Sequence, residues 1–142
     1  MHSTMTCSWQ GNLAFVSQLG DHAVRTDASA AHGGEGSGAS PKSLMMAALA
    51  GCTGVDVVAI LGKMRMAFSE LRIVVEAELT EEVPAVYRAM HLRYEIEGER
   101  VERDKVVKAV QLSQDKYCGV SAMYRRIMEI SWEVVVNGEK VV

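Results

Sequence analysis

Cysteine is scarce in this sequence, and no two cysteines have the close spacing of metal sites or redox motifs. The 142 residues contain three cysteines, Cys7, Cys52 and Cys118. An odd number without CxxC spacing argues against a secreted disulfide framework and against a structural zinc site. The four histidines show no ligand spacing, so we expect no bound metal. A reducing cytoplasm is the expected compartment.

The sequence also shows no excess of positive charge and no pattern of a secretory leader in its first ten residues. The formal net charge is −3 at pH 7, which gives no reason to expect nucleic acid or an anionic membrane surface as a partner. The first ten residues, MHSTMTCSWQ, have no basic start and no apolar run, so no signal peptide is expected. Length and composition, with 49% hydrophobic and 23% charged residues, fit one domain over residues 1–142.

A phosphate-binding loop is nearly present but lacks its second glycine. Residues 36–43, GSGASPKS, differ from a P-loop because Pro41 stands where that glycine belongs. Proline has no N–H to donate to a phosphate, and no buried strand leads straight into the loop. We therefore expect no nucleotide cofactor.

The longest apolar stretch, residues 40–66, predicts one long helix. Ser40 can cap its start, and Pro41 suits the first turn because its missing N–H needs no partner there. Apolar residues occur on every side of the helix between residues 44 and 61. A helix that is hydrophobic all round is normally buried all round.

A chain of this size cannot easily bury such a helix alone. Either the helix spans a membrane, or a second copy of the chain covers it. Residues 44–62 nearly reach spanning length, but Asp56 lies inside the run, and an unpaired carboxylate is costly at bilayer depth. We therefore expect a homodimer with this helix in its core, and no membrane as a partner.

The predicted strands come both before and after the long helix in the sequence. Apolar and polar residues alternate at 71–79 and 90–97, which most simply pair as a hairpin, and again at 128–136. Residues 5–28 contain two or three short strands broken by glycine turns, and the Gly-rich residues 29–39 predict a mobile loop.

Two helices are expected between the last two of these strands. Residues 102–117 have an apolar stripe with helical spacing, and a short helix follows at 120–126. Cys118 closes the first helix, and Gly119 fits a left-handed conformation just beyond it. The order is then β-β-β-α-β-β-α-β, an α+β pattern.

Two of the cysteines lie where they could carry chemistry. Cys52 is in the middle of the long helix, in ALAGCTG, and Cys118 is at a helix end, in KYCGVSAM. Free cysteine is among the most buried residue types, so spacing alone favours small core residues at both positions, as it does at Cys7.

The two cysteine segments together resemble those of a known family. SPKSLMMAALAGCTGVDVVAILGKMR, followed further along the chain by AVQLSQDKYCGVSAM, is similar to the OsmC/Ohr family of thiol peroxidases, and closer to its OsmC-like branch. The similarity extends to GDHAVRTDA and to the loop at Pro84. It implies an intertwined α+β homodimer, in which antiparallel sheets wrap two central helices and two equivalent sites lie at the subunit interface.

The resemblance also implies a reaction. The family's first cysteine is the nucleophile and its second resolves it, which makes Cys52 peroxidatic and Cys118 resolving. A thiolate attacks the O–O bond of an organic hydroperoxide or hydrogen peroxide and becomes a sulfenic acid. The second thiol condenses with that acid to a disulfide, which an external dithiol reduces. No cofactor is expected beyond that dithiol.

A cation must stabilise the Cys52 thiolate, and here the sequence departs from the family. The helix dipole is too remote, because Cys52 lies about eleven residues, on the order of 16 Å, from the helix start. Lys42 replaces the family's glutamate after the proline that starts the helix. Arg25 is the candidate cation by elimination, with a solvated strand residue as the alternative. Glu35 is the only glutamate before Lys42. Asp56, one turn beyond Cys52, could orient a cation or bond a neighbouring backbone group.

Other functions stay open on this scaffold. The replacement at Lys42 also fits a non-enzymatic redox sensor or a small-ligand-binding protein. A Cys/His acyl-transfer enzyme requires a histidine close to Cys52, and no local motif supplies one.

Overall fold

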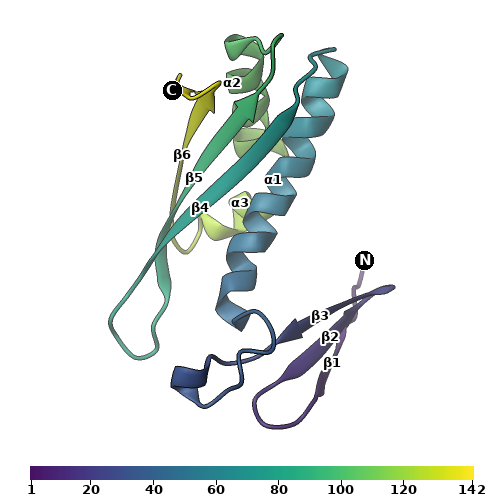
Figure 1. Cartoon of the computed structure of the whole chain (residues 1–142), viewed down its shortest axis with the longest axis vertical. Coiled ribbons are helices and arrows are strands. Elements are labelled where there is room, and N and C mark those ends of the chain that lie inside the picture. The colour runs from purple at the N-terminus through teal and green to yellow at the C-terminus, as the bar shows by residue number, and fades with distance from the viewer. The chain divides into compact units, whose positions relative to one another are not determined.

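The computed structural model describes all residues 1–142, which form two compact units, residues 1–45 and 46–142 (Figure 1). Each unit contains one sheet, of three strands in the first and four in the second. Strands and helices follow one another as in the predicted α+β pattern, with one additional two-residue strand at the end. The expectation of a single domain over the whole chain stays a prediction.

The N-terminal unit is a small antiparallel sheet with the strand order β1-β2-β3. Its strands are β1 Thr6–Trp9, β2 Phe15–Leu19 and β3 His22–Thr26. Short strands predicted within residues 5–28 are thereby confirmed. The turns fall at Gly11 and Asn12, with φ of 95° and 46°, and at Gly20, with φ of 60°. Glycine and asparagine enter this left-handed region at low cost, which is why the chain reverses there.

Asp27 organises the loop that follows β3. Its carboxylate accepts hydrogen bonds from the backbone N–H groups of Ala28 at 2.7 Å, Glu35 at 3.3 Å and Ser37 at 3.0 Å, and from the Ser37 hydroxyl at 2.6 Å. The bonds from Ser37 are the main reason that the pKa of Asp27 is lowered. Two 3-10 turns lie in this part of the chain, η1 Ala30–His32 and η2 Pro41–Ser43. The Gly-rich loop is therefore gathered around one carboxylate.

The long helix α1 spans Leu44–Lys63 and is shorter than the predicted helix over residues 40–66. The Ser40 side chain makes no capping hydrogen bond. Instead, the Ser43 hydroxyl donates to the Ser40 carbonyl at 2.6 Å. The first turn is therefore a 3-10 turn that Pro41 begins, and regular α-helix starts only after it.

The C-terminal end of α1 is a Schellman motif. Arg65 takes a left-handed conformation with φ of 56°. Its N–H donates to the carbonyl of Gly62 at 3.1 Å, and the N–H of Met66 donates to that of Leu61 at 3.0 Å. These two bonds satisfy the last carbonyls and stop the helix before the predicted end at residue 66.

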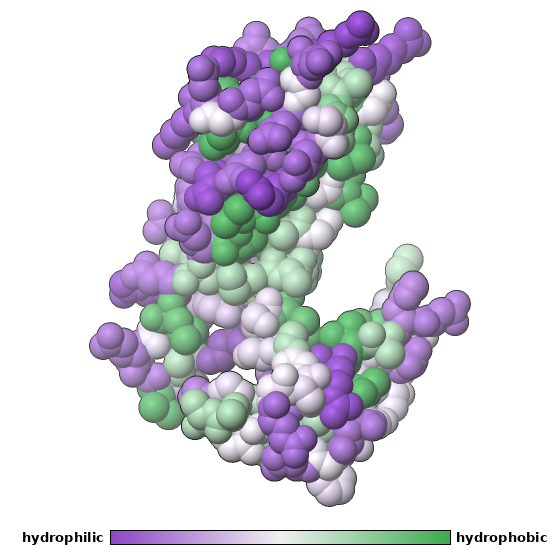
Figure 2. All heavy atoms as spheres, viewed as in Figure 1, coloured by the Kyte–Doolittle hydropathy of each residue, from purple (hydrophilic) through white to green (hydrophobic).

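Within this chain, only one stripe of α1 is buried. The buried residues recur at every fourth position, Leu49, Thr53, Val57 and Leu61. On other sides Val55 is 72% and Val58 47% exposed, and Figure 2 shows apolar surface along this side of the C-terminal unit. The single chain covers only the stripe that faces its sheet and remaining helices, as expected for a chain of this size, and burial of the other sides by a second copy stays a prediction.

The helical stretch Pro41–Lys63 is long and apolar enough to cross a membrane, and only 22% of its most apolar part is buried. Length and composition are weak evidence, since the core helix of a soluble protein meets the same test. Asp56, inside this stretch, accepts a hydrogen bond from Ser113 of the same chain.

The C-terminal unit contains a sheet in the order β4-β5-β6-β7. Its strands are β4 Glu70–Leu79, β5 Tyr87–Glu97, β6 Glu129–Val136 and β7 Glu139–Lys140. The predicted hairpin of β4 and β5 is confirmed, whereas β5 and β6 run parallel. The expectation of antiparallel sheets is therefore wrong for this pair. The chain returns through a helical crossover, which brings β6 back in the direction of β5.

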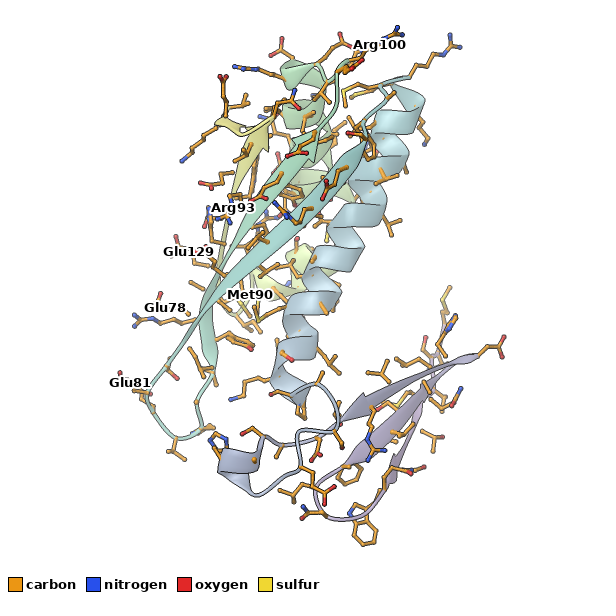
Figure 3. The ribbon with its side chains drawn as sticks, viewed as in Figure 1. Glu78, Glu81, Met90, Arg93, Arg100 and Glu129 are labelled. Atoms are coloured by element: carbon orange, nitrogen blue, oxygen red, sulfur yellow. The ribbon has the colours of Figure 1, made fainter.

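The two faces of this sheet differ in character. Four alternating residues of β5 are fully or almost fully buried: Met90, Leu92, Tyr94 and Ile96. Figure 1 shows α1 and α2 on one face of the sheet. The opposite face carries charges, and Arg93 pairs there with Glu95 at 2.7 Å and with Glu76 at 3.3 Å (Figure 3). The alternation predicted from sequence thus separates a core face from a solvated face.

Three helical pieces connect β5 to β6. They are α2 Arg103–Leu112, the π turn η3 Ser113–Tyr117 and α3 Gly119–Tyr124. The predicted helix over residues 102–117 therefore changes its winding at Ser113. Cys118 is extended, with φ of −74° and ψ of 103°, and caps α3. The left-handed conformation expected at Gly119 is wrong, because Gly119 is already the first residue of the next helix.

Candidate functional site

The structure brings Cys52 and Cys118 together. Cys52 is part of α1 and partly buried, whereas Cys118 joins η3 to α3 and is only 3% exposed. Both are free thiols, and Cys52 lies close enough to Cys118 to raise the pKa of its thiol. Cys7, the third cysteine, lies on the exposed strand β1 and accepts a hydrogen bond from Ser17 at 3.3 Å. The expectation that Cys7 is a small buried core residue is therefore wrong.

Burial dominates the acidity of Cys118. It raises the pKa of this thiol, and the neighbouring Cys52 raises it further. Ser121 acts in the opposite direction: its hydroxyl and its backbone N–H, which donates to the Cys118 sulfur at 3.4 Å, both lower that pKa. The Ser121 hydroxyl is fully buried and has no hydrogen-bond partner of ordinary geometry in the structure. At neutral pH, Cys118 is therefore a protonated thiol beside two donors that favour its thiolate.

A buried polar network begins at the residue next to Cys52. The Thr53 hydroxyl lies 2.7 Å from the Tyr94 hydroxyl and 2.7 Å from the Ser113 hydroxyl. Ser113 in turn donates to the Asp56 carboxylate at 2.9 Å. Thr53, Tyr94 and Ser113 are fully buried, so these bonds satisfy groups that have no access to water.

Gln114 and Arg125 extend this network to the end of α3. The Gln114 side-chain N–H₂ donates to the Tyr94 hydroxyl at 2.8 Å. Arg125 donates to the backbone carbonyl of Gln114 and, at 2.8 Å, to its side-chain oxygen. Burial raises the pKa of Tyr94, and its hydrogen bonds with Thr53 and Gln114 offset that rise only in part. The phenol therefore stays neutral and remains a hydrogen-bond donor.

Sequence reasoning missed most of this network. Thr53 and Asp56 could have pointed to it, since both are polar residues inside an apolar helix. Thr53 follows Cys52 directly, and Asp56 lies one helical turn beyond it. Tyr94 follows the apolar alternation of β5, and Gln114 lies within a predicted amphipathic helix. Neither pattern shows that both side chains turn toward α1.

The other predicted site residues have different neighbours. Arg25 donates to the Ser37 hydroxyl at 3.0 Å, and the backbone N–H of Glu35 donates to Asp27. Both bonds are internal to the N-terminal unit, so a role for Arg25 or Glu35 at the cysteine pair stays a prediction. Asp56 does lie in the network beside the cysteines, as acceptor of the Ser113 hydroxyl.

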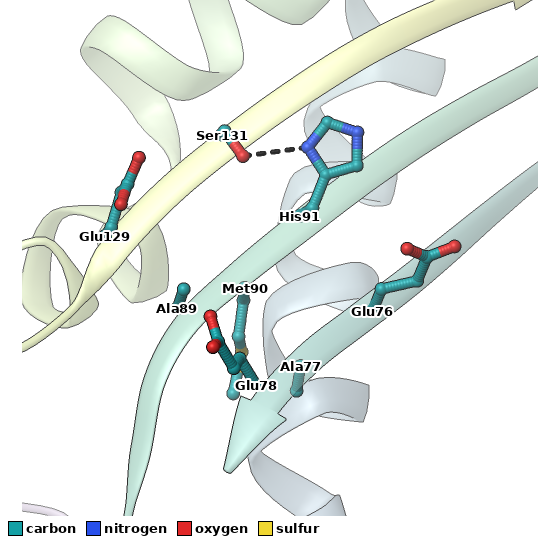
Figure 4. Close-up of a pocket in the computed structure, with 8 residues that line it drawn as sticks. All are labelled: Glu76, Ala77, Glu78, Ala89, Met90, His91, Glu129 and Ser131. Atoms are coloured by element: carbon teal, nitrogen blue, oxygen red, sulfur yellow. Dashed lines mark hydrogen bonds between the residues drawn. The ribbon is translucent and has the colours of Figure 1, made fainter. Parts of the chain in front are cut away.

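A hollow of about 370 Å³ lies on the solvated face of the second sheet, away from the cysteines (Figure 4). Its lining residues are Glu76, Ala77, Glu78, Ala89, Met90, His91, Glu129 and Ser131. His91 is hydrogen-bonded to Ser131 at 2.8 Å, and Glu78 is paired with Arg88. No group of three or more His, Cys, Asp or Glu side chains in the structure could hold a metal ion. The hollow is therefore a charged surface depression.

A family model described as OsmC-like protein matches residues 34–133, which include both Cys52 and Cys118. The chain therefore belongs to the OsmC-like protein family, which confirms the resemblance seen in the sequence. It is 34% identical to protein YhfA of Escherichia coli K12 over 98 residues, 68% of this chain and 73% of that protein.

Solved structures share the fold over almost the whole chain. A hypothetical protein from Aquifex aeolicus VF5 is 28% identical, with a TM-score of 0.81 over 96% of this chain and 98% of that one. The organic hydroperoxide resistance protein OhrB of Bacillus subtilis is 16% identical, with a TM-score of 0.67 over 94% and 98% of the two chains. At that identity, the likeness shows the fold alone.

Proposed function

We propose that this protein is a cysteine-dependent peroxidase that reduces organic hydroperoxides or hydrogen peroxide in a reducing cytoplasm. The observation that carries the proposal is that the Cys52 and Cys118 thiols are neighbours within one chain, close enough for Cys52 to raise the pKa of Cys118. Two neighbouring thiols can form a disulfide with little movement of the backbone. The chain also belongs to the OsmC-like protein family, and the solved structures that share its fold include a hydroperoxide resistance protein. Both observations support the same reaction class.

Cys52 is the nucleophile because it is the more accessible of the pair. Its thiolate attacks one peroxide oxygen, the O–O bond breaks, and the leaving alkoxide or hydroxide takes a proton to become an alcohol or water. Cys52 is then a sulfenic acid, oxidised by two electrons. Arg25 is the proposed cation for the thiolate, with Asp56 and Glu35 as supporting groups.

Cys118 resolves the sulfenic acid. Its sulfur attacks the Cys52 sulfur, a disulfide forms, and the sulfenic oxygen leaves as water with the proton of the Cys118 thiol. The raised pKa of Cys118 keeps it protonated until that step, and Ser121 stabilises the thiolate character that develops as the S–H bond breaks.

An external dithiol completes the cycle. The dithiol attacks the Cys52 sulfur, since Cys118 is almost inaccessible, and Cys118 leaves toward the Ser121 donors. The second thiol of the reductant then releases Cys52, so the reductant becomes a disulfide and the protein regains both thiols.

A second copy of the chain is the proposed cover for the exposed side of α1. Val55 and Val58 leave an exposed apolar surface on that side of the single chain. A homodimer would bury it, since exposed apolar patches mark interaction sites and most soluble oligomers are homo-oligomers.

A non-enzymatic redox sensor or small-ligand-binding protein is the second candidate. Lys42, in place of the family's glutamate, favours it because the group that orients the activating cation is changed. A sensor would still form the Cys52–Cys118 disulfide, but without rapid turnover.

Stopped-flow mixing of reduced protein with cumene hydroperoxide or hydrogen peroxide tests the proposal, followed by intact-mass analysis. We expect rapid loss of one equivalent of peroxide and a product two mass units lighter, which is the disulfide. A Cys7→Ser variant should behave like the wild type, since Cys7 lies on an exposed strand of the other unit. If Cys52 reacts no faster than free cysteine, the binding-protein alternative replaces the peroxidase.

A further inference from the structure

The buried network beside the cysteines has a fixed direction. Ser113 has one hydroxyl proton and gives it to Asp56, so the proton in its bond with Thr53 must come from Thr53. Thr53 has then used its own proton and must accept from Tyr94. Tyr94 in turn accepts from Gln114. Gln114 also donates to the Thr53 hydroxyl at 3.4 Å. Each hydroxyl between the two ends therefore donates one bond, while Tyr94 and Ser113 accept one and Thr53 accepts two.

The two ends of the network set this direction. Arg125 can only donate, and it donates to the side-chain oxygen of Gln114. Asp56, when ionised, can only accept. Hydrogen bonds thus run in one sense from a cation on α3 to an anion on α1, and reversal of any one would leave a buried group without its partner.

The same residues hold Cys118 through the backbone. The N–H of Cys118 donates to the Ser113 carbonyl at 2.7 Å, and the Gln114 carbonyl accepts from Arg125. Cys118 and Arg125 are the two caps of α3. Ser113 and Gln114 therefore bind α3 at both of its ends, while their side chains bind α1 and β5.

From this arrangement we infer that Ser113 and Gln114 are positioning residues for the thiol pair. Ser113 joins Cys118 to the turn of α1 that carries Cys52, through Thr53 and Asp56. Gln114 keeps the chain of donors directed toward Ser113. Together they hold the Cys118 segment so that its sulfur lies near that of Cys52. This placement favours formation of the Cys52–Cys118 disulfide over further oxidation of Cys52. This inference rests on the proposed two-cysteine reaction.

The quantity that such positioning sets is the effective concentration of one thiol toward the other. It is measured by equilibrating the protein with reduced and oxidised glutathione. In that exchange, oxidised glutathione takes two electrons from the protein dithiol and becomes two glutathiones, while the Cys52–Cys118 disulfide forms. Acid quenching, alkylation of free thiols and mass spectrometry give the oxidised fraction, in a Cys7→Ser background that removes the third thiol.

Ser113→Ala removes the link to α1 but keeps the carbonyl that binds Cys118. We expect the effective concentration to fall on the order of tenfold, as when one buried hydrogen bond no longer restrains the segment. Ser113→Thr keeps the hydroxyl and should restore most of it. Gln114→Glu keeps the size and the oxygen that faces Arg125 but loses the donor to Tyr94, so it should also lower the value.

Val106→Ala is the matched control, since Val106 is fully buried in α2 and its side chain has no polar atom. It should lower the melting temperature and leave the glutathione equilibrium unchanged. The inference is overturned if Ser113→Ala and Gln114→Glu keep the wild-type equilibrium, or if Val106→Ala shifts it equally. Those results would leave the proposed peroxidase intact. If the wild-type protein forms no Cys52–Cys118 disulfide even in excess oxidised glutathione, the two-cysteine reaction itself is wrong.

Discussion

The backbone N–H of Cys118 donates to the carbonyl of Ser113, five residues earlier, at 2.7 Å. This bond is the wide turn of a π helix, and single π turns are frequent at functional sites. It directs the Ser113 hydroxyl to Thr53 and Asp56 of α1 and leaves Cys118 as the extended joint before α3. One serine thus connects the segments that carry both cysteines.

Replacement of Cys52 and replacement of Cys118 should affect peroxide consumption differently. Cys52→Ser should abolish peroxide consumption, because it removes the nucleophile. Cys118→Ser should consume about one equivalent and then stop, with Cys52 trapped as sulfenic acid or oxidised further. Peroxide consumption and intact mass distinguish the two. Repeated turnover by Cys118→Ser with a dithiol at the wild-type rate would show that Cys118 is not the resolving residue.

Ser121→Ala should raise the pKa of Cys118. The Ser121 hydroxyl and N–H both lower that pKa in the native structure, and the substitution removes the hydroxyl. Ultraviolet absorbance of the thiolate as a function of pH measures the change, in a background of Cys7→Ser and Cys52→Ser. Ser131→Ala, on the opposite face of the sheet, should leave the titration unchanged. An unchanged or lower pKa in Ser121→Ala would remove Ser121 from the site.

Arg25 is testable through the reactivity of Cys52. If it is the activating cation, Arg25→Ala should slow alkylation of Cys52 at neutral pH, and Arg25→Lys should recover only part, since it keeps the charge but loses the planar fork. The pH dependence of alkylation of Cys52 in each variant is the measurement. Identical profiles for wild type and Arg25→Ala would exclude Arg25.

The protein should lose stability at alkaline pH through Tyr94. Burial raises the pKa of Tyr94 in the folded state, so the folded protein holds the phenol proton more tightly than the unfolded chain does. The resulting stabilisation is complete below the unfolded pKa of about 10 and is lost as the pH rises through the folded value. Chemical denaturation from neutral to alkaline pH should show this decline.

Tyr94→Phe should make the alkaline decline shallower and leave the part due to Cys118, whose pKa is also raised. It should also cost about 1–2 kcal/mol at neutral pH, because Thr53 and Gln114 lose their partner. Tyr117→Phe is the control, since Tyr117 is 53% exposed and its substitution should change neither quantity. Equal alkaline slopes for wild type and Tyr94→Phe would contradict the assignment.

The protein should be a dimer that dissociates on dilution. Val55→Lys places a charge on the exposed apolar side of α1 and removes roughly 2 kcal/mol of burial from each protomer, so about 4 kcal/mol from the dimer, which predicts a dimer on the order of a thousandfold weaker. Val83→Lys, at a position 99% exposed in the β4–β5 connection, should have no effect. Sedimentation equilibrium gives the dissociation constants. A stable wild-type monomer at micromolar concentration would contradict the proposed homodimer.

Local patterns predicted the elements but not their ends. Alternation found β4, β5 and β6, because a strand with one buried face repeats every two residues whatever its partner. The ends of α1 depend on bonds that carry weak sequence signals: Ser43 replaces Ser40 in the first turn, and Arg65 takes the left-handed position usual for glycine. The change at Ser113 from α to π winding was hidden, because both windings keep the same residues roughly on one side.

The sequence by itself determined the family, the α+β order and the two cysteines, since each follows from residue types and spacing along the chain. The tertiary structure alone decided three further matters: the proximity of Cys52 to Cys118, the parallel pairing of β5 with β6, and the network through Tyr94, Ser113 and Gln114. These join residues far apart in the chain. Their partners are set by how the helices and the sheet pack, and no local period of two or of about four residues contains that information.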